Sequence, residues 1–132
     1  MTDNERISAL VNEHRFNEGT ARAYVQSSGK CVYCDKNLLN ELSDFYAADI
    51  DHLLPKSKHP ELESDNNNWV LSCRACNSIK GKMDIPDLPW DASTAIKDHK
   101  EEVIAMVREA LQARRKAKEN EFLTIRRIIQ ER

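Results

Sequence analysis

The stretch that decides the fold runs from residue 49 to residue 77. It begins Asp49-Ile50-Asp51-His52 and ends Asn68-Trp69-Val70-Leu71-Ser72-Cys73-Arg74-Ala75-Cys76-Asn77. Two kinds of chemistry share it. A Cys-x-x-Cys pair has the spacing of metal ligands, and an Asp-His pair precedes an asparagine that directly follows the second cysteine. We therefore expect a zinc site and, beside it, a second site built from carboxylate, imidazole and amide groups.

The cysteines form two such pairs, with residues 35–72 between them. Four thiolates complete the tetrahedron that zinc prefers, and a site with no open position is structural, not catalytic. A redox or disulfide role is the alternative, but in a reducing compartment such pairs more often bind metal. The segment between the pairs is longer than in a common zinc ribbon, which indicates that it has a function of its own. The predicted Zn²⁺ ligands are Cys31, Cys34, Cys73 and Cys76.

Length and charge limit the classes of protein that fit. At 132 residues the chain is long enough for one domain, and 32% charged with 40% hydrophobic residues is typical of a globular protein. The N-terminal residues lack the apolar segment of a secretion signal, and no apolar stretch reaches the length of a membrane span, so we expect a cytoplasmic protein. A formal net charge of −2 does not indicate DNA binding by the whole surface; local basic side chains and a bound cation must supply it.

Short helices are predicted before the first cysteine pair. Apolar spacing indicates a helix over residues 3–14, with Asp3 or Asn4 as its N-cap, and a second helix near residues 18–27 that ends before Gly29. Residues 30–37 are predicted to form a tight metal-binding turn. Residues 38–47 fit either a helix or a strand.

The segment between and after the cysteine pairs predicts a strand, a loop, a second strand and a helix. Pro55 ends the first strand because it cannot donate to a sheet, and Ser72 can cap the helix, which Gly81 ends. In chain order these elements cover residues 48–53, 56–67, 69–71 and 73–80.

The C-terminal segment contains neither Gly nor Pro after Pro89 and is predicted to be helical over residues 92–131. One unbroken helix would be about 60 Å long, longer than so small a domain, so a break or a binding partner is expected. Ten basic against seven acidic residues from Lys97 to Arg132 fit either DNA contact or a solvated face. We expect a core with N-terminal helices over residues 1–91 and a helical extension over 92–132, either part of the same domain or a contact to another subunit or to DNA. Its apolar stripes are Val103, Val107, Ala110 and Leu111, then Phe122, Ile125, Ile128 and Ile129.

The ordered combination of Asp51-His52, Asn68, Cys76-Asn77 and Lys80-Gly81, framed by the cysteine pairs, resembles the HNH endonuclease family. The resemblance covers about residues 31–82, and Asn77 stands where the family name has its last His, a variant typical of the CxxCN branch. It implies a ββα-metal core stapled by a four-cysteine zinc site; with the short N-terminal helices and the long C-terminal helical segment predicted above, the expected fold class is α+β. It also implies a metal-dependent endonuclease that cuts DNA to 5′-phosphate and 3′-hydroxyl ends.

The resemblance assigns a role to each residue of the Asp-His-Asn combination, and each role agrees with the chemistry of the side chain. His52 is the expected general base, because imidazole titrates near neutral pH. Asp51 points to the opposite strand face from His52 and would hold Mg²⁺ or Mn²⁺ with an oxygen from Asn77, with Asp49 as an alternative ligand. Asn68 would hydrogen-bond across the loop and fix the strand that bears His52.

Basic side chains flank His52 and Asn77, where phosphates would lie. A single cation site implies that cutting both strands takes two subunits or two encounters. The expected DNA contacts are Lys56, Lys58, Arg74, Lys80 and Lys82.

Two alternatives stay open. In the first, the chain is a non-catalytic zinc-ribbon module that binds nucleic acid or protein, and His52, Asp51 and Asn77 are structural residues. In the second, the C-terminal helix is the functional part and forms a homodimer or binds a partner protein.

Overall fold

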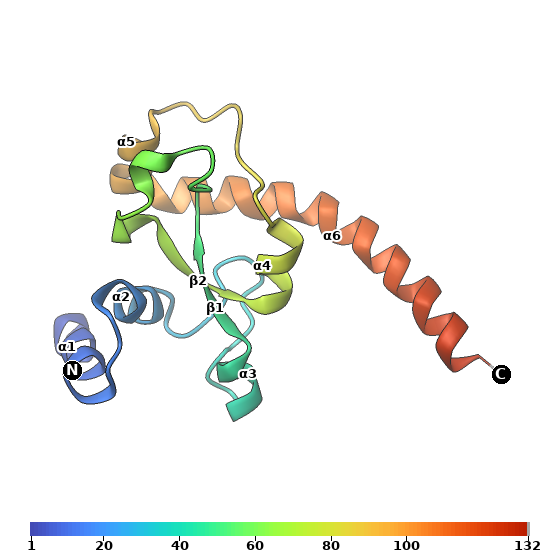
Figure 1. Cartoon of the computed structure of the whole chain (residues 1–132), viewed down its shortest axis with the longest axis horizontal. Helices are drawn as coiled ribbons and strands as arrows, with labels where there is room; N and C mark the ends of the chain where they lie inside the picture. Colours follow the sequence, from blue (N-terminus) through green and yellow to red (C-terminus); the bar gives the residue numbers. More distant parts are fainter. Residues whose placement is uncertain (132) are drawn as a thin grey trace.

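The computed structural model describes residues 1–131 and has an α+β fold, as predicted: a two-stranded antiparallel sheet with helices around it (Figure 1). Two short 3-10 turns, Pro60–Leu62 and Asn66–Asn68, lie in the loop between the strands. In chain order the other elements are α1 (Asp3–His14), α2 (Glu18–Ser27), α3 (Leu42–Tyr46), β1 (Ala48–His52), β2 (Trp69–Cys73), α4 (Arg74–Lys80), α5 (Ala92–Asp98) and α6 (Lys100–Gln130).

The sheet and α4 form a ββα unit. β1 and β2 pair antiparallel from Ala48 opposite Cys73 to His52 opposite Trp69. Because strand side chains alternate, the two aspartates of β1 lie on the face toward α4, while His52 and Trp69 share the other face. On that second face Gly19 of α2 is needed for close approach, since a Cβ there would lie 2.5 Å from Trp69 Cε3.

Helix ends differ from the expectation by one or two residues. α1 is capped by Thr2, whose hydroxyl accepts the Glu5 N–H, and not by Asp3 or Asn4. α4 is capped by the Cys73 sulfur and not by the Ser72 hydroxyl, because Ser72 Oγ donates to the Cys73 carbonyl instead.

The hydrophobic core extends from the sheet into α5 and the first half of α6. Leu71 of β2 and Ile96 of α5 share one buried cluster with Val103, Val107 and Leu111 of α6. This part of the C-terminal segment therefore shares its buried core with the sheet. The predicted break lies at His99, between α5 and α6, where the imidazole stacks on the Trp90 ring at 3.9 Å.

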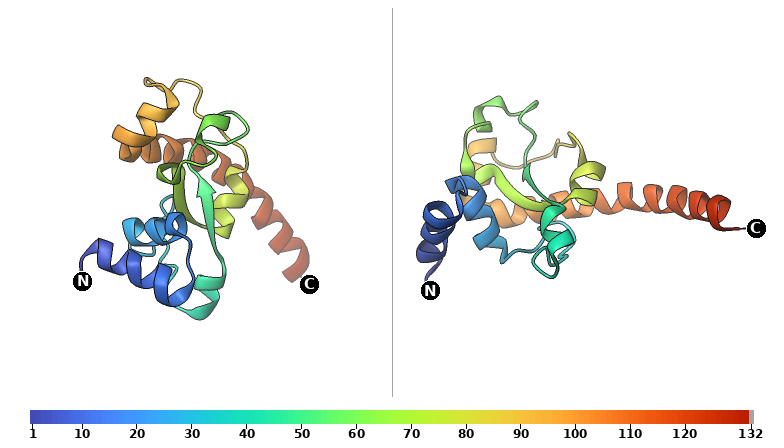
Figure 2. Two further views of the ribbon diagram at one scale, coloured as in Figure 1. Left: turned by 60° about the vertical axis from the view of Figure 1, so that its left-hand side comes forward. Right: turned by 60° about the horizontal axis from the view of Figure 1, so that its bottom comes forward.

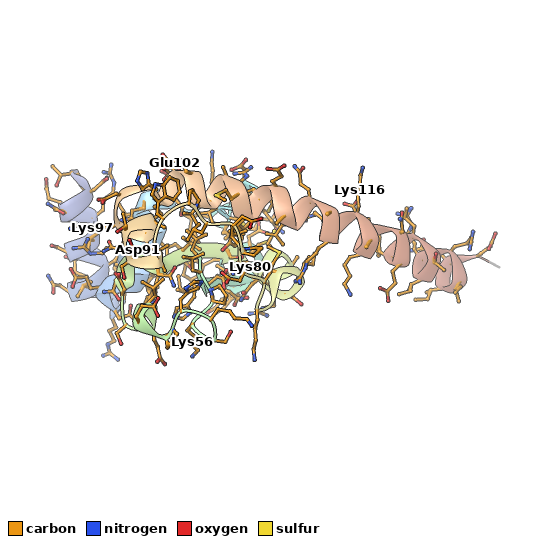
Figure 3. All side chains as sticks on the ribbon, turned by 90° about the horizontal axis from the view of Figure 1, so that it is seen from above. Lys56, Lys80, Asp91, Lys97, Glu102 and Lys116 are labelled. Atoms are coloured by element: carbon orange, nitrogen blue, oxygen red, sulfur yellow. The ribbon has the colours of Figure 1, made fainter. Side chains whose placement is uncertain are left out.

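The second half of α6 extends away from the body of the protein (Figures 2 and 3). No residue of α6 after Leu111 is buried. None of the helices within residues 1–131 has the length and apolarity that crossing a membrane requires. Five large apolar side chains of this distal part are 45–72% exposed: Phe122, Leu123, Ile125, Ile128 and Ile129.

Candidate functional site

The four cysteine sulfurs form one cluster. Their Sγ atoms all lie within 4.8 Å of one another, and Cys34 Sγ is 3.8 Å from Cys73 Sγ. A tetrahedral zinc with Zn–S bonds of about 2.3 Å has sulfur–sulfur edges of about 3.8 Å. The donor set and its spacing therefore fit a structural Zn²⁺ held by Cys31 and Cys76 together with the other two.

Backbone hydrogen bonds bring the two pairs together. Asp35 adopts a left-handed conformation (φ 65°), which turns the chain so that Cys31 N–H donates to the Lys36 carbonyl at 2.9 Å. Val32 N–H donates to the Leu71 carbonyl at 3.0 Å and so ties this turn to β2. The second pair lies at the start of α4, where Cys76 N–H donates to Cys73 Sγ at 3.4 Å.

The sulfurs influence one another strongly. A hydrogen bond from Cys76 lowers the pKa of the Cys31 thiol to about 4, and the same bond raises the pKa of Cys76. Burial raises the pKa of Cys34. Four thiolates at this spacing repel one another, so a fully deprotonated cluster requires a divalent cation.

Three arginines of α6 bind the two segments that carry the cysteines, and the sequence pattern had assigned them no contact. Arg108 donates to the Val32 carbonyl at 3.1 Å and to both carboxylate oxygens of Asp35 at 3.2 and 2.7 Å. Arg115 donates to Cys76 Sγ at 3.1 Å. Arg114 donates to the Lys80 carbonyl at 2.8 Å, at the end of α4. These arginines lie three or four residues before or after Leu111 of the buried stripe of α6. This helical spacing is the signal in the sequence that they lie on the side of α6 that faces the core.

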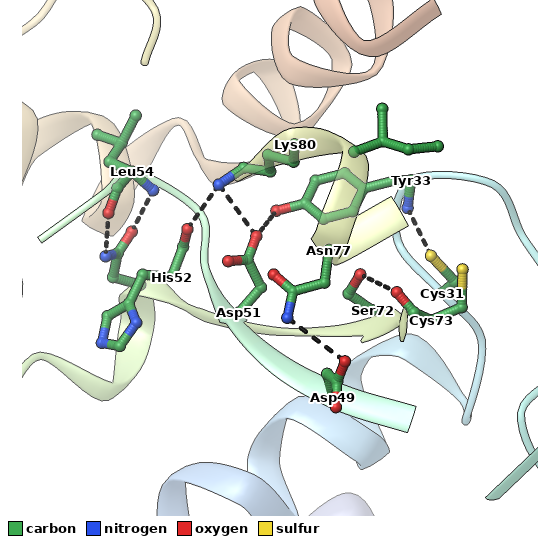
Figure 4. A network of polar contacts seen from close by, with 12 residues as sticks. Cys31, Tyr33, Asp49, Asp51, His52, Leu54, Ser72, Cys73, Asn77 and Lys80 are labelled. Atoms are coloured by element: carbon green, nitrogen blue, oxygen red, sulfur yellow. Dashed lines mark hydrogen bonds and ion pairs between the residues drawn. The ribbon is translucent and has the colours of Figure 1, made fainter. Parts of the chain in front are cut away.

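A second polar cluster surrounds Asp51 (Figure 4). Asp51 Oδ2 accepts a hydrogen bond from Tyr33 Oη at 2.6 Å and forms an ion pair with Lys80 Nζ at 3.0 Å. Lys80 Nζ also donates to the His52 carbonyl at 3.0 Å. Lys80 is only 1% exposed, so its expected role is corrected: its ammonium is enclosed in an internal ion pair and not open to a phosphate.

Asn77 lies between the two carboxylates of β1. Its Nδ2 is 3.4 Å from Asp49 Oδ2, and Figure 4 shows its amide oxygen on the side of Asp51. Carboxylate and amide oxygens are the ligands that Mg²⁺ and Mn²⁺ prefer. The residues present therefore fit a hard divalent cation, with Asp51 and Asn77 as ligands and Asp49 beside them.

The His52 ring does not converge on these oxygens. It is half-buried, lies edge-on to the Trp69 ring at 6.1 Å, and in Figure 4 points away from Asn77. The expected alternation between Asp51 and His52 is thus present in β1. Asp51 lies between the imidazole on one side and the amide of Asn77 on the other.

Asn68 fastens the chain directly after His52. It is buried, its Oδ1 accepts the Leu54 N–H at 2.9 Å, and its Nδ2 donates to the Leu54 carbonyl at 2.8 Å. Its own carbonyl accepts the Leu53 N–H at 2.8 Å. These are the cross-loop hydrogen bonds expected of this residue, and a part in catalysis remains a prediction.

The other expected DNA contacts lie at the surface. Lys56, Lys58, Arg74 and Lys82 are all exposed. Lys56 Nζ lies 4.0 Å from a Glu63 carboxylate oxygen, and Arg74 lies 3.7 Å from Asp49. Such pairs between solvated side chains are weak and leave the cations free to exchange partners.

Comparison with known proteins agrees with this geometry. Residues 31–83 match the model of the family described as HNH endonuclease. Over 58 residues the chain is 40% identical to Septu protein PtuB from Bacillus thuringiensis; the aligned part is 44% of this chain and 21% of that protein. The chain thus spans about a fifth of the length of this relative. No solved structure matches it significantly. The segment over residues 31–83, which holds the sulfur cluster and the Asp51–Asn77 cluster, therefore belongs to the HNH endonuclease family.

Proposed function

We propose that the chain is a metal-dependent DNA endonuclease that hydrolyses phosphodiester bonds, with His52 as general base and one Mg²⁺ or Mn²⁺ held by Asp51 and Asn77. The observation that carries this proposal is that Asn77 of α4 lies beside the two carboxylates of β1, next to the sulfur cluster and in the segment that matches the HNH family. The zinc is structural, and the compartment is a reducing one, the cytoplasm, where thiols persist.

The stereochemistry of the reaction sets where a base and a cation must lie. In an in-line displacement the attacking water and the leaving oxygen lie on opposite sides of phosphorus. A base and the ligands of a leaving-group cation are therefore needed on either side of the phosphate. The half-buried imidazole of His52 takes the proton of the water, and a bound cation would stabilise charge on the phosphoryl oxygens and the leaving 3′ oxygen.

The surrounding residues hold the substrate and the strand. The exposed cations Lys56, Lys58, Arg74 and Lys82 contact backbone phosphates, and they orient DNA without reading its sequence. Asn68 keeps the end of β1 in place through its two bonds to Leu54. The products carry 5′-phosphate and 3′-hydroxyl ends, as in the family that the sequence resembles.

A plasmid-nicking assay with Mg²⁺ or Mn²⁺ tests the proposal. His52→Ala should reduce the cleavage rate by about 10²–10⁴-fold, the usual contribution of a general base. Zinc content and the thermal unfolding curve should not change. His14→Ala, at an exposed position of α1, is the matched control and should cut like the unmodified chain. Unchanged nicking by His52→Ala would contradict the proposal that His52 is the general base.

A non-catalytic zinc module is the second candidate, and the direction of the His52 ring away from Asn77 favours it. Such a module binds DNA or protein and leaves phosphodiesters intact. The same assay separates the two functions. A module converts no supercoiled DNA to nicked circles at any metal concentration, and a DNA-binding module also retards the plasmid on a gel.

We also propose that the distal part of α6 pairs with a second copy of the chain. Phe122, Ile125 and Ile129 are exposed and have the 3–4 spacing of a coiled-coil seam. In a parallel pair the residues that flank this seam, Glu121 of one copy and Arg126 of the other, would meet with opposite charge. Two copies would also supply the two active sites that double-strand cleavage by a one-cation site requires.

Light scattering on the full chain tests this pairing. The unmodified chain should have twice the monomer mass, and Ile125→Glu/Ile129→Glu should return it to the monomer mass. Asn120→Glu/Gln130→Glu adds the same charge away from the stripe and should remain dimeric. A monomeric unmodified chain would contradict the pairing and leave the stripe to a partner protein.

A further inference from the structure

The two oxygens of the Asp51 carboxylate have different surroundings. Oδ2 accepts a hydrogen bond from the Tyr33 hydroxyl at 2.6 Å and is ion-paired with the Lys80 ammonium at 3.0 Å. Oδ1 has no hydrogen-bond donor among residues 1–131, and in Figure 4 the amide of Asn77 lies beside the carboxylate. A carboxylate held in this way offers one oxygen to a cation and not two.

We propose that Tyr33 and Lys80 are positioning residues that fix Asp51 as a one-oxygen metal ligand; this inference rests on the proposed cation site. All three side chains are enclosed, with 6% of Tyr33, 8% of Asp51 and 1% of Lys80 exposed. Hydrogen bonds in such surroundings are strong, and partners of this kind orient a ligand and tune its affinity for metal. Rotation of the carboxylate toward two-oxygen binding would break both bonds to Oδ2.

The arrangement links both metal sites. Tyr33 belongs to the turn between Cys31 and Cys34, so its hydroxyl is placed by the sulfur cluster. Lys80 also holds the His52 carbonyl at 3.0 Å, so one ammonium positions the proposed metal ligand and the backbone of the proposed base. The orientation of Asp51 therefore depends on the zinc-bound turn as well as on α4.

The direct test is Mn²⁺ binding by the zinc-loaded full chain without DNA, measured from the electron paramagnetic resonance signal of free Mn²⁺. Tyr33→Phe keeps the ring and removes only the donor to Oδ2. It should weaken Mn²⁺ binding by about 10–100-fold, the range for loss of a residue that orients a ligand. Tyr46→Phe makes the same chemical change on an exposed ring and should bind Mn²⁺ like the unmodified chain.

Cleavage measured against Mn²⁺ concentration gives a second readout. Tyr33→Phe should need about 10–100 times more Mn²⁺ for half-maximal rate and reach a maximal rate close to that of the unmodified chain. Loss of this buried hydrogen bond lowers the unfolding temperature under either role, so a merely structural role is recognised by lost zinc, or by lost stability with the Mn²⁺ dependence unchanged, and either result with Tyr33→Phe overturns the inference. Equal Mn²⁺ affinity of Tyr33→Phe and the unmodified chain, or no Mn²⁺ binding by the unmodified chain, also overturns the inference.

The same experiments keep the two proposals apart. If Tyr33→Phe weakens Mn²⁺ binding but the unmodified chain cuts no plasmid, the positioning of Asp51 stands and the nuclease function fails. If the unmodified chain cuts DNA and Tyr33→Phe shows the same Mn²⁺ dependence, the function stands and the positioning of Asp51 is refuted.

Discussion

The sulfur cluster and the Asp51–Asn77 cluster are separated by a single peptide bond, that between Cys76 and Asn77, yet they are built in opposite ways. The sulfur cluster has four ligands from two segments and needs no further group to complete a tetrahedron. The Asp51–Asn77 cluster, called the oxygen cluster below, brings together only two candidate oxygen ligands with Asp49 nearby, so the proposed cation would keep open positions for water and substrate. The first arrangement suits a permanent part of the fold, and the second suits a site that exchanges ligands during turnover.

The packing around the clusters shows the same contrast. Arginines of α6 reach the sulfur cluster and its turn, as Arg115 does at Cys76 Sγ and Arg108 at Asp35. The oxygen cluster is held from inside by Lys80 and Tyr33, and exposed cations such as Arg74 lie outside it. Four changes, taken from the largest expected effect to the smallest, test whether the two clusters differ as their structures indicate.

Removal of zinc should have the largest effect. Structural zinc sites bind with about 10–16 kcal/mol, comparable to the whole stability of a small domain, about 5–15 kcal/mol. A strong thiol-competing chelator, or Cys73→Ser, should therefore abolish the cooperative unfolding transition seen by circular dichroism. Added Zn²⁺ should restore it in the chelated protein. A zinc-free chain that melts like the holoprotein would show that the sulfur cluster is dispensable to the fold.

Lys80→Met should have the next largest effect, because it leaves the enclosed Asp51 carboxylate without its counter-ion. Loss of one partner of a buried ion pair costs about 3–5 kcal/mol. Urea unfolding measures this loss, with the exposed Lys82→Met as the matched control. Adding Asp51→Asn to Lys80→Met should recover part of the stability. If Lys80→Met is as stable as the control, the oxygen cluster is more open to water than its burial indicates.

Arg114→Met should have a moderate effect. The guanidinium donates to the carbonyls of Ile79 and Lys80 at the end of α4, the helix that carries residues of both clusters. A hydrogen bond of this kind contributes about 0.5–1.5 kcal/mol, so we expect a small shift of the urea midpoint. Lys116→Met, an exposed residue of α6, is the control. An equal shift in both variants would mean that α6 is not anchored to α4 through Arg114.

Asp35→Asn should have the smallest effect, and its pH dependence is the useful measurement. A hydrogen bond from Arg108 lowers the pKa of Asp35 below its ordinary value. The contribution of the Asp35–Arg108 pair to the free energy of unfolding is therefore fully present above the ordinary carboxyl pKa of about 3.9. It is lost as the pH falls through the folded-state pKa of Asp35. Because Arg108 and Asp35 are 39% and 66% exposed, the contribution should be below about 1 kcal/mol.

The free energy of unfolding, measured with urea, should differ between Asp35→Asn and the unmodified chain by a constant amount from about pH 8 to about pH 5. This interval lies above both the ordinary and the folded-state pKa of Asp35. Asp87→Asn, at an exposed position, provides the comparison for loss of a carboxylate. A difference that grows steadily as the pH falls over this interval would contradict the assignment of this pair.

The sequence predicted the sulfur cluster and the ββα unit well because their signals are local. Cysteine spacing identifies zinc ligands directly, and the alternation in residues 48–53 predicted that Asp51 and His52 face opposite ways. The strand, loop, strand and helix between Ala48 and Lys80 were predicted within a few residues of their ends. Errors were confined to boundaries, where a cap can be provided by one of several neighbouring polar groups.

The contacts made by long side chains could not be predicted in this way. Lys80 meets Asp51 only because β1 and α4 pack together, and nothing near Lys80 in the sequence indicates a buried carboxylate. Arg114 and Arg115 lie in a basic segment that was open between DNA contact and solvent, yet both bond to α4. Such contacts depend on the packing of helices that are far apart in the chain, which periodicity within one helix does not describe.

The unbroken course of α6 has a mechanical consequence. Its docked half is fixed to the domain by Val103, Val107 and Leu111, and the free half continues as the same helix for about 22 Å beyond residue 115. A tilt of about 10° at the docked half would swing the free end by about 4 Å over that length. A protein bound to the free end would therefore change the direction in which the ββα unit faces with a small force.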